Sequence, residues 1–128
     1  AATAIMLSLP ISWSAMSTTL FEKIIAREIP GDIVHEDEFC VAFRDISPAA
    51  PMHVLLVPRK PIPMLSQAGD EDAALLGHMM RTAPKVAEAL GFADQFRLVI
   101  NNGAEVGQTV FHLHMHLLAG RDLQWPPG

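Results

Sequence analysis

The sequence predicts an α+β fold built from five strands, one short helix and one long helix. Five short stretches have the alternation or the apolar composition of strands, and turn residues separate them. One longer stretch, residues 71–90, carries apolar residues at helical spacing. Half of the 128 residues are apolar and 18% are charged, so the chain can bury a core of its own.

The first residues form a separate stretch. Residues 1–15 are apolar, carry no charge and contain Pro10, which makes them a poor membrane span. They also lack the basic residues of a secretory signal or a mitochondrial presequence. Met16-Ser17 resembles a start of translation. We therefore expect residues 1–16 to be an extension of unclear role, either added to the protein or translated by read-through from upstream. Residues 17–128 are expected to form the domain.

A short helix is predicted at the start of the domain. Ser17-Thr18-Thr19 provides an N-cap, and Ile29-Pro30-Gly31 ends the helix. The apolar residues at helical spacing between them are Leu20, Phe21, Ile24 and Ile25.

Three strands are predicted next. Residues 32–36 and 39–44 predict a hairpin that turns at Asp37-Glu38. After a loop at 45–48, the apolar run at 52–57 predicts a third strand, which Pro58 ends.

The long helix has clear signals at both ends. Asp70 is a favourable N-cap, and Gly91 follows the last helical residue. Pro84 lies inside this helix and lacks an N–H group, so we expect a bend there. The expected buried stripe consists of Leu75, Leu76, Met79, Met80, Ala83, Val86, Ala87 and Leu90.

The last two strands flank a glycine-containing loop. Residues 96–101 predict the fourth strand, residues 102–108 the loop, and residues 111–118 the fifth strand. In this fifth strand three of the six histidines of the chain alternate with apolar residues, which places all three imidazoles on one face. The opposite, buried face would carry Phe111, Leu113, Met115 and Leu117.

The row of imidazoles predicts nucleophilic catalysis. A neutral imidazole can attack phosphorus when one ring nitrogen is bare and the other donates its proton to a fixed acceptor. Flanking imidazoles can donate to phosphate oxygens as negative charge develops. His114 is the best nucleophile candidate because it alone has an imidazole on each side.

Two other interpretations of the row stay open. A zinc site is one, but the backbones of His112 and His116 would be about 13 Å apart in a strand, at roughly 3.3 Å per residue. Three imidazoles on one ion therefore do not fit, and further ligands would have to come from His53 or Cys40. The other interpretation is a structural row held by hydrogen bonds.

The loop before the histidines is a candidate phosphate site. Gly103 and Gly107 allow backbone N–H groups to turn inward, although glycine in a loop often serves only the turn. Thr109 adds a hydroxyl group that could bind a leaving group. The chain contains neither a phosphate-loop motif nor a dinucleotide-binding glycine fingerprint.

Charge and cysteine content limit partners and compartment. The net charge of −5 argues against a protein that coats nucleic acid or a membrane surface. Cys40 is the single cysteine, lies in an apolar run and is expected in the core. A chain without an internal disulfide suits the cytoplasm, or an organelle if residues 1–16 are a remnant of a targeting segment.

Several motifs resemble a known family. His112-Leu-His114-Met-His116-Leu-Leu resembles the His-φ-His-φ-His-φ-φ signature of the histidine triad (HIT) superfamily. Within it, residues 20–25, 43–48, 98–101 and the Trp-Pro-Pro-Gly end at 125–128 resemble the histidine triad nucleotide-binding (Hint) branch. The resemblance covers residues 18–128.

The resemblance implies a homodimer in which two five-stranded antiparallel sheets join into one continuous ten-stranded sheet. It also implies a purine nucleoside phosphoramidase that hydrolyses the P–N bond of adenosine 5′-phosphoramidates and related adenylates. It further implies that the chain uses no metal or other cofactor and that its ligand is a purine nucleotide resembling AMP.

The resemblance also assigns roles to residues. His114 would form a nucleotidyl-histidine intermediate, with His112 and His116 positioning it and hydrogen-bonding phosphate, and His53 supporting them. Thr109 also matches a catalytic position. The matched substrate-binding positions are Asp45 and Asn101 for the ribose, Leu20, Phe21, Ile24, Phe43 and Ile46 for the purine, Gly107, Gln108 and Thr109 for the phosphate, and His114, His116 and Trp125.

The chain departs from the branch at three positions. Thr109 replaces the usual Ser, and its added methyl group is expected to slow the leaving-group step. Ala119 replaces the first Gly of the usual Gly-Gly-Arg, and Pro84 interrupts a helix that usually lacks proline. His35 and His78 lie outside every matched motif, and we expect both on the surface.

Two alternative functions stay open. One is a dinucleoside polyphosphate hydrolase of the same superfamily, against which the Trp-Pro-Pro-Gly end argues. The other is a nucleotide- or partner-binding protein with vestigial turnover, against which the three intact triad histidines argue.

Overall fold

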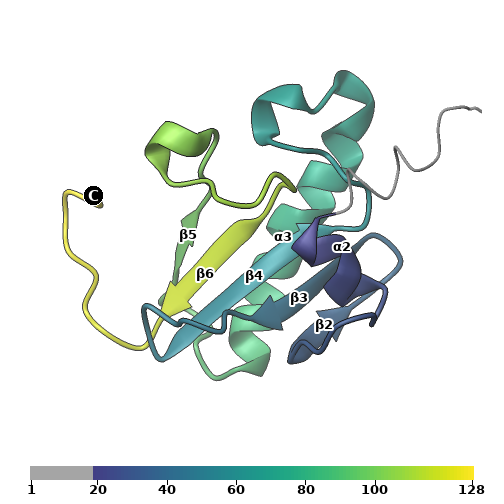
Figure 1. Ribbon diagram of the computed structural model, residues 1–128. Helices are drawn as coiled ribbons and strands as arrows, with labels where there is room; N and C mark the ends of the chain where they lie inside the picture. The colour runs from purple at the N-terminus through teal and green to yellow at the C-terminus, as the bar shows by residue number, and fades with distance from the viewer. Residues whose placement is uncertain (1–18) are drawn as a thin grey trace, which may run out of the picture.

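The computed structural model describes residues 19–128, and the predictions for residues 1–18 lie outside the described part. Five strands form one antiparallel sheet, which confirms the predicted α+β fold, and their order in the sheet is β2-β3-β4-β6-β5 (Figure 1). The strands are β2 (Ile33–Glu36), β3 (Cys40–Arg44), β4 (Met52–Pro58), β5 (Arg97–Val99) and β6 (Met115–Ala119). The helices are α2 (Leu20–Ile25) and α3 (Ala73–Ala89), with 3₁₀ turns η1 (Leu65–Gln67), η2 (Asp70–Asp72) and η3 (Ala104–Val106).

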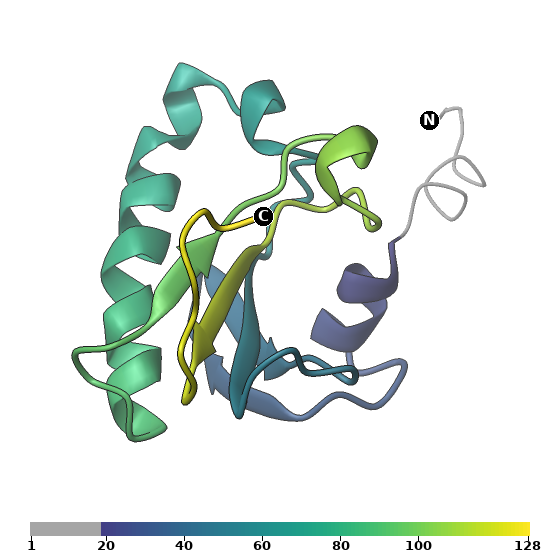
Figure 2. The same ribbon diagram turned by 90° about the vertical axis from the view of Figure 1, so that its left-hand side faces the viewer.

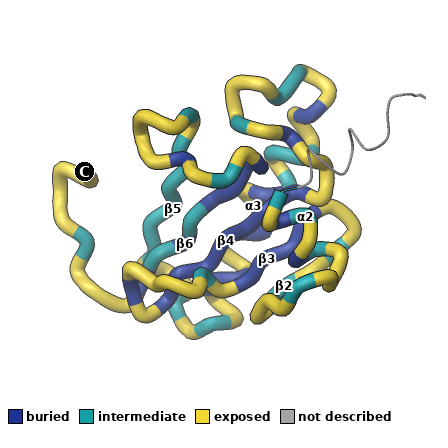
Figure 3. Tube along the Cα trace, viewed as in Figure 1, coloured by how far each residue is buried: buried dark blue, intermediate teal, exposed yellow. Residues whose placement is uncertain are grey.

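The sheet is covered on both faces, with α3 on one side and α2 on the other (Figure 2). The buried residues accordingly form two clusters, a larger one under α3 and a smaller one under α2. Burial is concentrated on the central strands, whereas the C-terminal tail is mostly exposed (Figure 3). Cys40 lies in the larger cluster with no exposed surface, so its predicted core position is confirmed.

The short helix begins where predicted and ends earlier. The Thr19 hydroxyl accepts the Glu22 N–H at 3.2 Å, and the Glu22 carboxylate accepts the Thr19 N–H at 3.0 Å. This reciprocal capping box satisfies two N–H groups that a helix start leaves free. The helix ends at Ile25, and Arg27 has a φ of 60°, so the chain leaves the helix before the predicted stop at 29–31.

The long helix differs from the prediction at its start and on one face. Asp70 begins the 3₁₀ turn η2 and does not cap α3, and the carboxylate of Asp72 accepts the Gly69 N–H at 2.9 Å. Met80 was expected in the buried stripe but is 53% exposed. The predicted stop is confirmed, because Gly91 follows the helix with a φ of 95°. The helix continues through Pro84, and the bend there stays a prediction.

The histidine strand is shorter than predicted. β6 begins at Met115, and residues 111–114 precede it as irregular chain. The Leu113 N–H donates to the Ile62 carbonyl at 2.7 Å, a partner in a loop. Phe111 is 44% exposed, so its predicted place on the buried face is wrong. Met115 and Leu117 do pack into the larger core cluster, as expected.

Two histidines predicted on the surface are partly buried. His35 on β2 and His78 on α3 both hydrogen-bond the carboxylate of Asp37, at 2.8 and 2.9 Å. Their side chains are only 30% and 36% exposed. This shared partner lies 41 positions from His78 in the sequence, so local patterns could not reveal it.

Among the helices of residues 19–128, none combines the length and the apolar character needed to cross a membrane.

Candidate active site

A cavity of about 380 Å³ lies between α2 and the sheet, and His114 and His116 line it. Its volume is within the range of small-molecule sites, and its wall is mainly apolar. The two imidazoles are in contact, with ring centroids 5.0 Å apart. Nine of the thirteen predicted substrate-binding residues line this cavity: Leu20, Phe21, Ile24, Phe43, Asp45, Ile46, Thr109, His114 and His116.

The tautomer of His114 is fixed by its own backbone neighbour. Nδ1 of His114 lies 2.7 Å from the carbonyl oxygen of His112. A carbonyl can only accept a hydrogen bond, so Nδ1 must carry the proton. Nε2 of neutral His114 is therefore bare, which is the state a nucleophile needs.

His116 is fixed by a chain of two further donors. The Ala49 N–H donates to Nδ1 of His53 at 3.0 Å, so the proton of His53 is on Nε2. Nε2 of His53 then donates to Nδ1 of His116 at 2.9 Å. Neutral His116 must consequently carry its own proton on Nε2. His116 therefore offers an N–H donor in the cavity wall, and its tautomer is fixed by His53, which is in turn fixed by the Ala49 N–H.

Both ring nitrogens of His112 hydrogen-bond to other residues of the chain. Its Nε2 donates to the Pro58 carbonyl at 2.7 Å, and its Nδ1 accepts from the Thr19 hydroxyl at 3.3 Å. The side chain has no exposed surface and does not line the cavity. The expected hydrogen bond from His112 to phosphate is therefore not available in this arrangement, because both ring nitrogens are occupied. What His112 does supply is its carbonyl oxygen, which orients His114.

The environment keeps all three imidazoles neutral. Burial lowers the pKa of His112 and of His114 below the ordinary value of 6.5, although each donates to a backbone carbonyl. Burial, together with the neighbouring His114 and His53, lowers the pKa of His116 to about 4. At neutral pH the row is therefore uncharged, and a bare Nε2 on His114 persists.

Phe21 of α2 explains part of this burial. Its ring lies edge-on to His114, with centroids 4.9 Å apart, and also contacts Phe43 at 5.4 Å. It contacts His112 as well, at 6.1 Å. These contacts place His112 and His114 on the α2 side of the sheet, as the alternation predicted.

The loop before the histidines does not form the predicted anion nest. The N–H groups of Gly103, Gly107 and Gln108 all bond within the loop. The Gln108 side chain is buried and donates to the carbonyls of Pro63 and Val110. Positive φ angles of 108° and 110° show that the two glycines serve the turns around η3.

Four predicted binding residues lie outside the cavity lining. Gly107 and Gln108 belong to the loop just described, and the Asn101 side chain lies beside Gly107. Trp125 is on the C-terminal tail and is 81% exposed. Within one chain, these four residues therefore lie outside the cavity that the predicted purine-binding residues line.

Six lining residues were not predicted. The turn after α2 was predicted only to end the helix, yet it forms part of the cavity wall. Its Pro-Gly pair is the sequence signal that could have indicated this turn. The charged member of the set pairs with Asp32 at 3.2 Å. The six residues are Ile29, Pro30, Gly31, Arg44, Leu55 and Val110.

One group at the site could also hold a metal ion. Asp45, His53 and His116 offer ligand atoms within 4.8 Å of one another, which agrees with His53 as the best extra ligand. Cys40, the other candidate, lies in the core cluster packed under α3. Asp45 accepts the Ser47 N–H at 2.7 Å with one oxygen, and its other oxygen lies 3.6 Å from His53.

The fold and site define a small α+β protein in which the neutral imidazoles of His114 and His116 line a cavity of small-molecule size. Residues 26–123 match the family model described as the HIT domain. The chain belongs to the HIT domain family.

Relatives and solved structures support this assignment. The chain is 66% identical over 110 residues to an uncharacterized HIT-like protein of Synechocystis, covering 86% of this chain and 96% of the relative. A HIT family hydrolase from Legionella pneumophila is 45% identical, with a TM-score of 0.84 over 87% of this chain and all of the other. A HIT family hydrolase from Clostridium thermocellum is 46% identical, with a TM-score of 0.81 over 84% and 94% of the two chains.

Proposed function

We propose that this chain is a hydrolase that cleaves the P–N bond of purine nucleoside 5′-phosphoramidates through a nucleotidyl-histidine intermediate. The observation that carries the proposal is the hydrogen bond from His114 Nδ1 to the His112 carbonyl. It leaves a bare Nε2 on a neutral imidazole in the wall of a ligand-sized cavity. The two HIT family hydrolases among the similar structures agree with a hydrolytic reaction.

The proposed reaction has two steps. Nε2 of His114 attacks the α-phosphorus, the P–N bond breaks, and the leaving nitrogen departs with a proton from solvent that the Thr109 hydroxyl helps to deliver. The imidazole is then cationic, and the His112 carbonyl stabilises its Nδ1 proton. Water next attacks the phosphorus and releases a proton to solvent, the P–N bond to His114 breaks with its electron pair returning to Nε2, and the nucleoside monophosphate leaves.

The flanking groups assist the transferred phosphoryl group. His116, with its proton on Nε2, is the proposed donor to a phosphate oxygen, and His53 fixes that tautomer. Thr109 lines the cavity and is exposed, so its hydroxyl can bind the leaving group. His112 acts as a positioning residue, because its ring contacts only protein groups.

The apolar part of the cavity is the proposed purine pocket. Phe21, Phe43 and Ile24 provide apolar walls, and Ile46 is 95% exposed at the cavity, where a base could cover it. Asp45 carries the carboxylate proposed to accept the ribose hydroxyl groups. The reaction as proposed uses no metal ion.

We also propose that two copies form a dimer. β5 is an edge strand that pairs only with β6 within this sheet, so a second sheet could extend it. Trp125, exposed and outside the cavity of its own chain, could then contribute to the site of the partner. Sedimentation equilibrium of the full chain tests this, and a monomer at micromolar concentration would contradict it.

The function is tested by trapping the intermediate. The full chain is mixed with an adenosine phosphoramidate, quenched in alkali and analysed by intact mass. We expect a nucleotidyl adduct that disappears as substrate is consumed, and no adduct in His114→Ala, whose turnover should fall by about 10⁴-fold or more. The matched control is His35→Ala, on the other face of the sheet, which should form the adduct normally.

Two outcomes distinguish the alternatives. Faster cleavage of a dinucleoside polyphosphate than of the phosphoramidate would favour the other hydrolase branch. Tight AMP binding without adduct or turnover in the unmodified chain would contradict the enzymatic proposal and favour a binding protein.

A further inference from the structure

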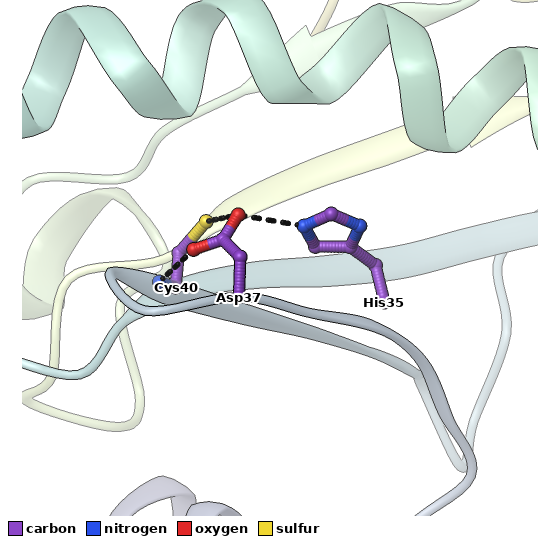
Figure 4. A group of neighbouring side chains, drawn as sticks. All are labelled: His35, Asp37 and Cys40. Carbon is purple, nitrogen blue, oxygen red and sulfur yellow. Dashed lines mark hydrogen bonds and ion pairs between the residues drawn. The ribbon is translucent and has the colours of Figure 1, made fainter.

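Four side chains with metal-binding chemistry meet on the face of the sheet that α3 covers. His35 comes from β2, Asp37 from the hairpin turn and Cys40 from the start of β3, and His78 comes from α3. Figure 4 shows His35, Asp37 and Cys40 pointing toward the helix above the hairpin. None of the four belongs to the proposed catalytic site, which lies under α2.

One carboxylate oxygen is at the centre of the group. Oδ2 of Asp37 lies 2.8 Å from Nε2 of His35 and 2.9 Å from Nε2 of His78. It also lies 3.5 Å from Sγ of Cys40. The ligand atoms of His35, Asp37 and Cys40 are all within 4.8 Å of one another.

This spacing is close to that of a tetrahedral zinc site. Zinc–ligand bonds of about 2.0–2.3 Å imply ligand atoms roughly 3.3–3.8 Å apart at tetrahedral angles. The ligand atoms of His35, Asp37 and Cys40 therefore need to adjust by about an ångström or less to enclose such an ion, and Nε2 of His78 lies 2.9 Å from Oδ2 of Asp37. The adjustment falls on the rotatable side chains, because the hairpin is already closed by the Asp37 N–H on the Cys40 carbonyl.

The four side chains combine a buried sulfur atom with imidazole and carboxylate groups that are partly exposed to solvent. Cys40 has no exposed surface, whereas the side chains of His35, His78 and Asp37 are 30%, 36% and 25% exposed. An ion can reach the imidazoles and the carboxylate from solvent and then meet the sulfur beneath them. Phe39 covers one side, since its ring packs edge-on against His78 with centroids 5.1 Å apart.

We propose that His35, Asp37, Cys40 and His78 form a binding site for a divalent transition-metal ion of the zinc type. Imidazole, thiolate and carboxylate ligands suit zinc and its neighbours, whereas calcium and magnesium select oxygen ligands. The site would fasten the β2–β3 hairpin to α3, two elements far apart in the sequence. It stands independently of the proposed catalytic function.

Binding exchanges protons for the ion. Without metal, burial and the nearby Asp37 raise the pKa of the Cys40 thiol to about 12, so the sulfur holds its proton. The ion must displace that proton into solvent, and a bound cation stabilises the thiolate. Each imidazole must carry its remaining proton on Nδ1, so that Nε2 can bind the ion in place of its present bond to Asp37.

Cobalt titration of the full chain tests the site. The chain is stripped with EDTA and titrated with Co²⁺, and Zn²⁺ is then added. We expect one equivalent of Co²⁺ to give the near-ultraviolet absorption of a thiolate–cobalt bond, and Zn²⁺ to remove it. His35→Asn and His78→Asn should each weaken Co²⁺ binding at least about tenfold. Because both side chains are partly exposed, these variants can fold normally.

Two controls make the result decisive. His53→Asn alters the other potential metal cluster and should leave the thiolate absorption unchanged. Zn²⁺ should raise the Tm of the unmodified chain by several degrees and that of the double variant H35N/H78N hardly at all. The proposal is overturned if Co²⁺ gives no thiolate absorption, or if that absorption keeps its affinity in both histidine variants.

Discussion

The two faces of this sheet each carry a group of histidines, but the partners of those histidines differ in kind. Under α2, the imidazoles of His112, His114 and His116 bond to carbonyl groups, a hydroxyl group and another imidazole, all neutral. Under α3, His35 and His78 bond to one carboxylate, that of Asp37. Neutral partners leave a buried imidazole uncharged and nucleophilic, whereas a shared anion creates a place for positive charge. The same residue type is therefore proposed to serve covalent chemistry on one face and cation binding on the other.

The titration behaviour of the two groups follows this difference. Burial lowers the pKa values of His112, His114 and His116. Burial alone would raise the pKa of Asp37, but hydrogen bonds from His35 and His78 and from two backbone N–H groups hold it well below its usual range.

Removing the central carboxylate should have the largest effect on stability. In the metal-free protein, Asp37→Ala removes the acceptor for two imidazoles and for the N–H groups of Phe39 and Cys40. We expect a loss of about 3 kcal/mol in the free energy of unfolding, measured by urea denaturation. Asp37→Asn keeps one acceptor oxygen for the turn and should lose less. An equal loss in both variants would show that the turn contacts do not matter.

Truncating one imidazole on each face should separate catalysis from structure. His116→Ala removes a proposed phosphate donor and should lower kcat/KM for a phosphoramidate by about 100-fold. His35→Ala, on the opposite face, should leave kcat/KM within about twofold, a range within measurement scatter for sites that do not interact. A comparable drop in both variants would contradict the division of roles between the two faces.

Acid should affect the two faces in different pH ranges. The folded pKa of His116 is about 4 against 6.5 for the free group, so its contribution is complete above pH 6.5 and is lost as pH falls toward 4. The lowered pKa of Asp37 gives a contribution that is lost only below its ordinary range near 4. We expect stability to fall by about 2 kcal/mol between pH 6.5 and 4, and by less in His116→Gln. An unchanged slope in that variant would contradict the assignment.

The smallest predicted effect concerns the link between α2 and the histidine row. Thr19→Ala removes the capping hydroxyl of α2 and the donor to His112. We expect a loss of about 1 kcal/mol in thermal unfolding experiments. Thr19→Ser keeps the hydroxyl group and should be close to the unmodified chain, and instability of Thr19→Ser would point to the methyl group instead.

Local patterns predicted the strands, because each has its own apolar run and turn residues. They also predicted that the imidazoles share one side. The structure agrees for His112 and His114, which both contact Phe21 of α2. The length of the histidine strand was overestimated, because alternation continues into residues 111–114 while the Leu113 N–H finds its partner in a loop.

Contacts between distant segments could not be predicted. The surface expectation for His78 failed because its partner Asp37 lies on a different element, and alternation or helical spacing carries no information about that pairing. The predicted phosphate nest failed for a local reason, since the N–H groups of Gly107 and Gln108 bond inside their own turn. That both ring nitrogens of His112 are occupied is likewise decided by Pro58 and Thr19, which lie far from His112 in the sequence.

The tautomer of His114 is the most direct test of this account. Long-range ¹H–¹⁵N correlation spectra of the labelled chain at neutral pH report which imidazole nitrogens carry protons. The account predicts protonated Nδ1 and bare Nε2 on His114, with titration only below pH 6.5. A proton on Nε2, or an imidazolium at neutral pH, would contradict it.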